Sequence, residues 1–348
     1  MSSRDRHPRR AWLAVAAVAA LLVVIGVLGA VGTGLVGRNA SSSQGATKGG
    51  TLPRADAGWR WVSFRGVAVQ VPQRWDYGFE PANPWCMYDD TSRVERAPYV
   101  AFDATNLAIA GVGCIGESPD HHPEEFGPAP ARFWAPHLSF AVSSSRATED
   151  GPLRFRGWTL TTKLVAGVPI SLLTDEETAS LTDRILDSAR TFDTDDNGCD
   201  ASSPVQAQEF VRPQPFDVAA VPRVDSIAIC QYARGIPADA GALVGSRRLT
   251  GASASSVLEA IRAAPAGGGP DTPQTCLHSE AGRTAIDLRL DDGSGAHDLY
   301  VYFDSCIHNG FDDGTTVREL TSAACRPLFG DNVVLFEGSS RPFERCHG

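Results

Sequence analysis

The first hydrophobic pattern along the chain is an apolar run over residues 11–37, which carries no charged side chain between Arg10 and Arg38. At about 1.5 Å per residue, a helix of this length extends about 40 Å, which is more than the ~30 Å hydrocarbon core of a bilayer. Inside that core, a single helix satisfies its own backbone hydrogen bonds. The pattern therefore predicts a transmembrane helix over residues 11–37.

Charges before this run indicate its orientation. Residues 1–10 carry four arginines against one acid, Asp5, and cationic flanks stay on the cytoplasmic side of a membrane. A cleaved signal peptide is the alternative, but the apolar middle of such a peptide spans only about 7 to 15 residues. We expect residues 1–10 to form a cytoplasmic tail, the helix to remain uncleaved and the rest of the chain to be extracytoplasmic.

The next pattern change separates a linker from a folded region. Residues 38–57 are small, polar and without periodicity, which is typical of a flexible linker. Within residues 58–193, apolar alternation predicts a hairpin over residues 59–72. Further strands are expected within residues 99–111, 132–142, 153–163 and 164–173.

A helix is predicted after these strands. Thr174 and Glu177 have the spacing of a capping box, and apolar residues then repeat every four positions up to Ala189. Several strands closed by one helix predict an antiparallel α+β domain over residues 58–193.

The clearest alternation lies in the second half of the chain, after a proline-rich connector over residues 194–222. Between residues 286 and 303, apolar residues alternate with polar ones on either side of the turn-forming segment DDGSG. This pattern predicts an antiparallel hairpin with one face in water.

Two strands and a helix over residues 253–265 are expected before this hairpin. A second capping box, Thr316 with Glu319, predicts another helix after it. With a closing strand at residues 333–336, the order is β-β-α-β-β-α-β. We therefore expect a second antiparallel α+β domain over residues 223–348.

Eight cysteines follow the apolar run, and an even number outside the membrane predicts disulfides. No Cys-x-x-Cys pair or closely spaced cysteine and histidine set has the pattern of a structural zinc site. A bridge between Cys86 and Cys114 would close a loop in the first domain, and we expect Cys276 to pair with Cys306. The predicted disulfide cysteines are Cys86, Cys114, Cys199, Cys230, Cys276, Cys306, Cys325 and Cys346.

The balance of acidic and basic residues limits the classes of partner that the chain can bind. The chain has 41 acidic and 31 basic residues, for a net charge of -10, and beyond the N-terminal tail the basic residues are scattered among acids. A phosphate backbone is bound by concentrated Lys and Arg, so we expect no nucleic-acid partner. No phosphate-cradling glycine loop follows a strand, and we expect no cofactor.

Several segments resemble those of actinobacterial single-pass membrane or secreted proteins with a cysteine-rich extracytoplasmic region. They are GVAVQVPQRW, DDNGC, SIAICQYA and NGFDDGTTVRELT. This resemblance implies an extracytoplasmic location and carries no activity or catalytic residue. A hairpin that ends in Val-Pro, and a final helix with a Ser-Ala-Arg stretch, make the first domain similar to the Mog1/PsbP-like fold.

The best metal candidate consists of Asp193, Asp195 and Asn197, followed by Gly198. Alternating oxygen ligands and a glycine turn reproduce the first half of an EF-hand calcium loop. However, position twelve of that frame is Pro204, where the loop needs a bidentate Glu. An acidic interdomain turn is therefore the preferred interpretation, with calcium binding as the alternative.

Two further polar clusters have simple explanations. The segment HHPEE at residues 121–125 lacks the i, i+4 histidine spacing of a zinc helix, and an exposed loop accounts for it. The segment HNGFDDG at residues 308–314 could serve acid–base chemistry, but Asn-Gly and Asp-Gly are first of all turn formers. No G-x-S-x-G motif supports a serine nucleophile.

Tryptophans are confined to the first domain, apart from the membrane segment. They can stack on sugar rings or form a hydrophobic core, and we favour the core. These residues are Trp59, Trp61, Trp75, Trp85, Trp134 and Trp158.

Together the patterns predict a membrane-anchored extracytoplasmic protein that binds a partner protein or a cell-wall polymer without catalysis. An extracytoplasmic hydrolase, whose acids converge only in the fold, is the alternative. A pocket with a carboxylate pair of raised pKa, or with a histidine–acid dyad, would favour the hydrolase.

Overall fold

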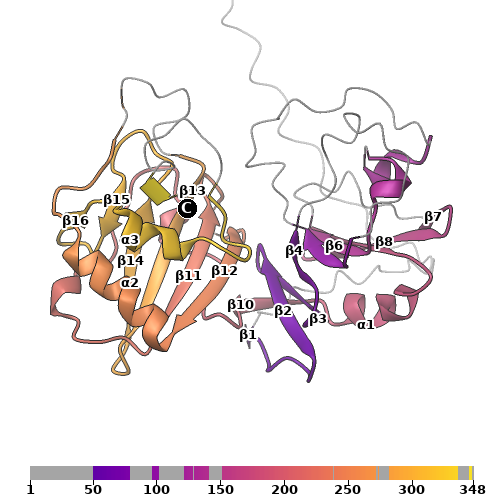
Figure 1. Ribbon diagram of the computed structural model, residues 1–348, viewed down its shortest axis with the longest axis horizontal. Coiled ribbons are helices and arrows are strands. Elements are labelled where there is room, and N and C mark those ends of the chain that lie inside the picture. Colours follow the sequence, from indigo (N-terminus) through magenta and orange to yellow (C-terminus); the bar gives the residue numbers. More distant parts are fainter. Residues whose placement is uncertain are drawn as a thin grey trace, which may run out of the picture. The chain divides into compact units, whose positions relative to one another are not determined.

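The computed structural model describes residues 50–78, 96–101, 121–127, 129–140, 151–237, 239–271, 273, 282–335 and 345–346. All of them belong to one compact unit, Ala46–Gly348. Over these residues the chain forms three β-sheets and few helices, so the fold is α+β (Figure 1). The predicted transmembrane segment lies outside this part of the chain, in which no helix is long and apolar enough to cross a bilayer.

The smallest sheet has the strand order β1-β10-β3-β2. Its strands are β1 (Gly50–Thr51), β2 (Trp59–Phe64), β3 (Val67–Pro72) and β10 (Arg190–Thr194). The predicted hairpin is confirmed as β2 and β3, whose turn has positive φ at Arg65 and Gly66. β1 pairs in parallel with β10, and Leu52 after it is buried. Residues 50–57, which composition predicts to be part of the linker, therefore contribute a strand and a buried leucine to the fold.

The second sheet has the order β4-β5-β6-β9-β8-β7. Its strands are β4 (Asp76–Gly78), β5 (Tyr99–Ala101), β6 (His137–Phe140), β7 (Leu153–Phe155), β8 (Trp158–Val165) and β9 (Val168–Thr174). The pairs made by β6 to β9 are antiparallel, as predicted. The pairs β4–β5 and β5–β6 are parallel, so a purely antiparallel sheet is wrong here. Long connections between these strands allow the crossovers that parallel pairing needs.

Helix α1 (Thr182–Asp187) follows this sheet and buries Ile185. The capping box predicted before it is wrong, because Thr174 is the last residue of β9 and its hydroxyl donates to Thr159 in the sheet. Asp175 instead stabilises the turn between β9 and α1. Its Oδ1 accepts from the backbone N–H of Thr178 at 3.1 Å and from the Thr178 hydroxyl at 2.8 Å.

The third sheet is antiparallel throughout, with the order β12-β11-β13-β14-β15-β16. Its strands are β11 (Ser226–Ala233), β12 (Leu243–Thr250), β13 (Thr284–Asp291), β14 (Ala296–Tyr302), β15 (Gly310–Asp312) and β16 (Val317–Arg318). The predicted hairpin is confirmed as β13 and β14, with Leu288 opposite Leu299. The predicted helix before it is α2 (Gly251–Ala263), which lies across one face of this sheet (Figure 1).

The second predicted capping box is also wrong. The backbone N–H of Thr316 donates to Asp313 Oδ1 at 2.6 Å in the turn between β15 and β16. The helix begins only at Ser322, as α3 (Ser322–Cys325). The described part of the expected closing strand forms one bridge, between Gly330 and Val333. In the part of the chain that the structure describes, the other short helices are 3-10 turns at Glu124–Phe126, Ala131–Phe133, Ala179–Leu181, Pro204–Gln206, Val218–Ala220 and Arg326–Leu328.

At the end away from its turn the β13–β14 hairpin is buried on both faces, where Asp287, Tyr300 and Tyr302 are at most 4% exposed, so the expectation of one wet face is wrong there. Nearer the turn, the side chains of Arg289 and Asp298 are 27% and 42% exposed.

On one face of the third sheet, Val257 and Ile261 of α2 belong to the same hydrophobic core as Leu288. On the other face, Tyr300 and Tyr302 belong to a core to which distant parts of the chain contribute. These contributors include Leu52, Trp61, Ala68, Phe192, Cys199 and Val205.

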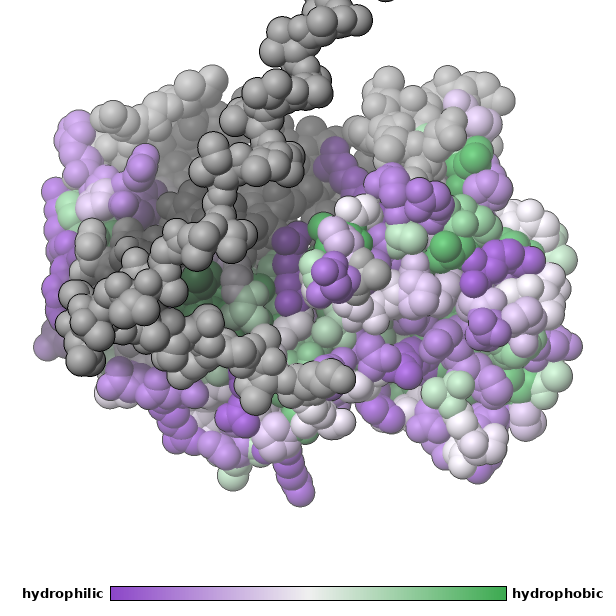
Figure 2. Space-filling model, turned by 180° about the vertical axis from the view of Figure 1, so that it is seen from behind, coloured by the Kyte–Doolittle hydropathy of each residue, from purple (hydrophilic) through white to green (hydrophobic). Residues whose placement is uncertain are grey.

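The described surface is mainly hydrophilic. Seen from behind, hydrophobic residues form small, separate patches among hydrophilic ones (Figure 2). The exposed large hydrophobic residue in the described ranges is Leu164, which is 55% exposed near the tip of the β8–β9 hairpin. Apolar burial is thus concentrated in the cores between and beneath the sheets.

Candidate functional site

The face of the third sheet opposite α2 is crossed by residues 199–218, which we call the strap. From its beginning to its end, the strap contacts β11, β13, β14 and β15 in turn, which is their order in the sheet. The disulfide of Cys199 with Cys230 reaches β11, and Ser203 bonds to Asp287 on β13. Val211 then bonds to Tyr302 on β14, and later strap residues bond to β15. The predicted connector therefore functions as a cover for the sheet.

Asp287 lies beneath the strap and is only 4% exposed. Its Oδ2 accepts a 2.8 Å hydrogen bond from Ser203 Oγ, while its Oδ1 is buried and has no hydrogen-bond partner. Burial raises the pKa of Asp287 to about 8, and the negative charge of Asp298 adds to the rise. At neutral pH this carboxyl is therefore mostly protonated.

One guanidinium group faces three carboxyls at this site. Arg289 Nη1 lies 2.8 Å from Asp200 Oδ2, and its Nε lies 3.4 Å from Asp298 Oδ1. Burial raises the pKa of Asp298, and the charge of Arg289 opposes that rise. Because Arg289 is already shared by two acids, a proton on Asp287 limits the excess of negative charge.

Tyrosine side chains complete the surroundings of the buried acid. Tyr300 stands directly opposite Asp287 in the β13–β14 pair and is 4% exposed. Burial and the neighbouring Asp287 raise the pKa of Tyr300, whereas a hydrogen bond with Ser203 lowers it. A protonated carboxyl beside two hydroxyls can act as a general acid, but only for a substrate within hydrogen-bond reach.

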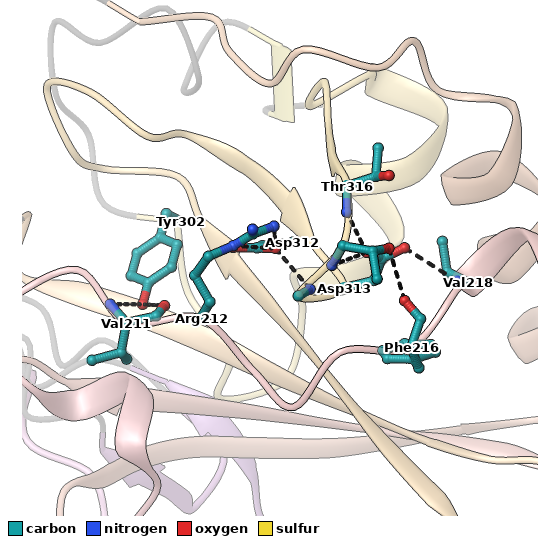
Figure 3. A network of polar contacts seen from close by, with 10 residues as sticks. Val211, Arg212, Phe216, Val218, Tyr302, Asp312, Asp313 and Thr316 are labelled. Carbon is teal, nitrogen blue, oxygen red and sulfur yellow. Dashed lines mark hydrogen bonds and ion pairs between the residues drawn. The ribbon is translucent and has the colours of Figure 1, made fainter.

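A second polar network holds the far end of the strap (Figure 3). Arg212 makes a two-pronged ion pair with Asp312, with Nη2 to Oδ1 at 2.6 Å and Nε to Oδ2 at 2.8 Å. Asp313 is 1% exposed, and its Oδ2 accepts from the backbone N–H of Val218 at 3.2 Å. The hydroxyl of Tyr302 donates to the carbonyl of Val211 at 2.7 Å. These contacts bind the strap to the outer strands of the sheet.

The predicted calcium ligands do not converge on one point. Asp193 is exposed on β10, whereas Asp195 is 3% exposed and accepts from Ser246 Oγ at 2.5 Å and from the backbone N–H of Cys199 at 2.8 Å. Asn197 turns its amide nitrogen toward Ser246. Within the described ranges, no group of three or more His, Cys, Asp or Glu side chains could hold a metal ion. Calcium binding stays a prediction, and this geometry favours the alternative of an acidic turn.

The two other predicted clusters have structural roles. His122 lies among aromatic rings, with its ring centroid 4.9 Å from that of Trp134, and its Nε2 lies 3.1 Å from the carbonyl oxygen of Ala129. His308 is stacked on Phe210 of the strap, with ring centroids 4.4 Å apart. The aspartates that follow His308 belong to the strap network of Figure 3.

The cysteines described by the structure are all disulfide-bonded. Cys199 pairs with Cys230, and Cys325 pairs with Cys346. Cys306 is also in a disulfide, but its predicted partner Cys276 lies outside the described residues. The predicted bridge between Cys86 and Cys114 lies outside them as well.

The core interpretation of the tryptophans agrees with their burial. Trp61, Trp75, Trp134 and Trp158 are at most 7% exposed. Trp59 is half-buried, and the Arg184 guanidinium lies over its ring at 4.0 Å. Trp85 lies outside the described residues.

Sequence reasoning missed the acids beneath the strap. Asp287 occupies a polar position in the alternating pattern of β13, and such positions are assigned to solvent when no cover is known. The available signal was the tyrosines of β14, Tyr300 and Tyr302, on the same face. Large aromatic side chains on a supposedly wet face indicate that something covers it.

Comparisons with protein-family models, curated proteins and solved structures found no match.

Proposed function

We propose that this chain is a membrane-anchored extracytoplasmic protein that binds a partner protein or a cell-wall polymer without catalysing a reaction. In this proposal residues 11–37 cross the membrane, residues 1–10 remain in the cytoplasm, and two disulfide-stapled α+β domains lie outside. The disulfides of Cys199 with Cys230 and of Cys325 with Cys346 support an oxidising compartment.

The non-catalytic role is supported by the two acids on the covered face of the third sheet, which are buried and bonded to the strap. Asp287 is 4% exposed and bonds to Ser203 of the strap, and Asp313 is 1% exposed and bonds to Val218. These carboxyls stabilise the fold through groups of the chain itself. A general acid or base must instead lie within hydrogen-bond reach of its substrate.

Crosslinking in native membranes tests the binding role. We expect the full chain to capture a defined partner or wall fragment, identified by mass spectrometry. A chain that ends at residue 57, with the anchor and linker alone, is the matched control. Equal capture by the two chains would show that the extracytoplasmic unit contributes no binding.

The topology has a separate test. Mass spectrometry of the mature protein should find residues 1–37 attached to the remainder of the chain. A mature amino terminus near residue 31 or 41 would contradict the anchor, while leaving the extracytoplasmic location intact.

A hydrolase is the second candidate, because the pKa of both Asp287 and Asp298 is raised and the two charges interact. Hydrolysis of wall fragments by the full chain would support it if Asp287→Asn abolished the activity. Asp291→Asn is the matched control, because Asp291 lies on the same strand and its side chain is 46% exposed. Activity that survives Asp287→Asn unchanged would remove this acid from the candidates.

A further inference from the structure

The strap is attached to the sheet at both ends, with the buried acid between the attachments. At one end Cys199 is bonded to Cys230, and at the other Arg212 pairs with Asp312. Between them, Ser203 donates to Asp287. Arg234 also donates to strap carbonyls, at 3.0 to 3.1 Å, from residues 207–209. The hydrogen bond from Ser203 to Oδ2 thus joins the middle of the strap to Asp287, and it leaves Oδ1 of this buried carboxyl without a donor.

The groups that interact with Asp287 come from the strap and from three strands. They are Asp200 and Ser203 of the strap, Tyr232 of β11, Arg289 of β13, and Asp298, Tyr300 and Tyr302 of β14. Among them Arg289 is the only cation, and it already lies 2.8 Å from Asp200. An ionised Asp287 would thus be a third carboxylate beside one guanidinium, with its buried Oδ1 still lacking a donor. Water is the ready source of such donors.

We propose that the strap is a proton-dependent latch, which stays on the sheet while Asp287 carries a proton and lifts at residues 200–211 when Asp287 ionises. Lifting admits water to the carboxylate and uncovers the faces of Tyr300 and Tyr302. The disulfide at Cys199 keeps the strap tethered, so that it can close again when the proton returns. The raised pKa of Asp287 agrees with this geometry, because it reports that the closed state favours the protonated form.

Hydrogen exchange of the full chain, followed by mass spectrometry between pH 5 and 8, tests the latch. The amide of Val211 donates to the Tyr302 hydroxyl at 3.3 Å, and the amide of Gly235, just after β11, donates to the carbonyl of Gln206 at 2.8 Å. Both bonds break when the strap lifts, so these two amides report its opening. After correction for the intrinsic exchange rate, their opening constant should rise by up to about tenfold per pH unit, because only the closed state retains the proton. In Asp287→Asn the opening constant should be independent of pH.

Asp291→Asn is the matched control and should keep the pH dependence of the wild type, since Asp291 lies at the exposed end of β13. A wild-type opening constant that does not change between pH 5 and 8 would overturn the latch, and this measurement needs no variant. The latch would also be overturned if the amides of Val211 and Gly235 exchanged at the same rate as the amides of β13 at every pH. The strap would then open only together with the whole sheet.

Discussion

Asp313 offers a sharp test of how the strap network stabilises the fold. Its carboxylate accepts from the backbone N–H groups of Val218 at 3.2 Å, Thr315 at 2.9 Å and Thr316 at 2.6 Å, and from the Thr315 hydroxyl at 2.6 Å. A buried donor that loses its partner costs about 1–3 kcal/mol. With three backbone donors involved, we expect Asp313→Ala to lower the free energy of unfolding by about 3–6 kcal/mol.

The isosteric variant should cost less. In Asp313→Asn the amide oxygen can still accept from Thr315 and Thr316, but the amide nitrogen meets the N–H of Val218, donor against donor. One lost bond and one repulsive contact amount to about 1.5–3 kcal/mol. The predicted order of stability is therefore wild type, then Asp313→Asn, then Asp313→Ala.

Urea denaturation with the disulfides intact measures these differences as shifts of the midpoint at constant slope. Asp217→Ala is the control, because exposed Asp217 accepts from one backbone N–H, that of Ala219 at 2.9 Å, and should cost about 1 kcal/mol. The reasoning is refuted if Asp313→Ala shifts the midpoint no more than Asp217→Ala does.

The same carboxylate predicts acid sensitivity. Burial raises the pKa of Asp313, but its hydrogen bonds with Thr315, Thr316 and Val218 together lower the pKa further, below its ordinary value. The ionised form therefore stabilises the fold above about pH 4, and this contribution is lost as the pH falls through the lowered pKa. Asp313→Ala should lose less stability on acidification than the wild type.

Three further predictions concern other parts of the fold. Asp287 should give stability the opposite pH dependence, because its folded pKa of about 8 exceeds its ordinary value of 3.8. The free energy of unfolding should fall by up to about 1.4 kcal/mol per pH unit between about pH 4 and 8. Urea denaturation should show no such slope in Asp287→Asn. Gly241→Ala should lower the melting temperature, because its Cβ would overlap the backbone at Arg65 and overpacking costs about 1–3 kcal/mol; unchanged melting would contradict this. Gln231→Ala should cost about 2–4 kcal/mol and speed hydrogen exchange at Val334, which bonds to the Gln231 side chain at 2.8 and 3.0 Å; an unchanged exchange rate would exclude that role.

Elements whose partners are close in sequence could be predicted from the sequence. The β13–β14 hairpin follows from alternation around DDGSG, and α2 follows from the spacing of Val257 and Ile261. Both patterns report a buried face formed within a short segment. The strands and helix that they define are confirmed.

Features that depend on distant partners could not be predicted in the same way. The spacing of Thr316 and Glu319 fits a capping box, but Asp313 takes the N–H of Thr316 and keeps it in a turn. Likewise, Asp287 has the pattern of a solvent-facing strand residue, but Ser203, far away in sequence, covers it. A pattern of neighbouring residues shows which local structure is favoured, but it does not show which distant residue will contact them. The contacts of Thr316 and Asp287 are decided by tertiary packing.

The core shared by the small sheet, the strap and the third sheet restricts how such a protein can change by recombination. Trp61 and Phe192 pack in the same cluster as Tyr300, and the disulfide of Cys199 with Cys230 ties the strap to β11. A crossover between residues 200 and 222 that supplied a foreign second half would leave Trp61 and Phe192 without their cover and Cys199 without its partner. The two halves should therefore be inherited together and not exchanged as independent modules.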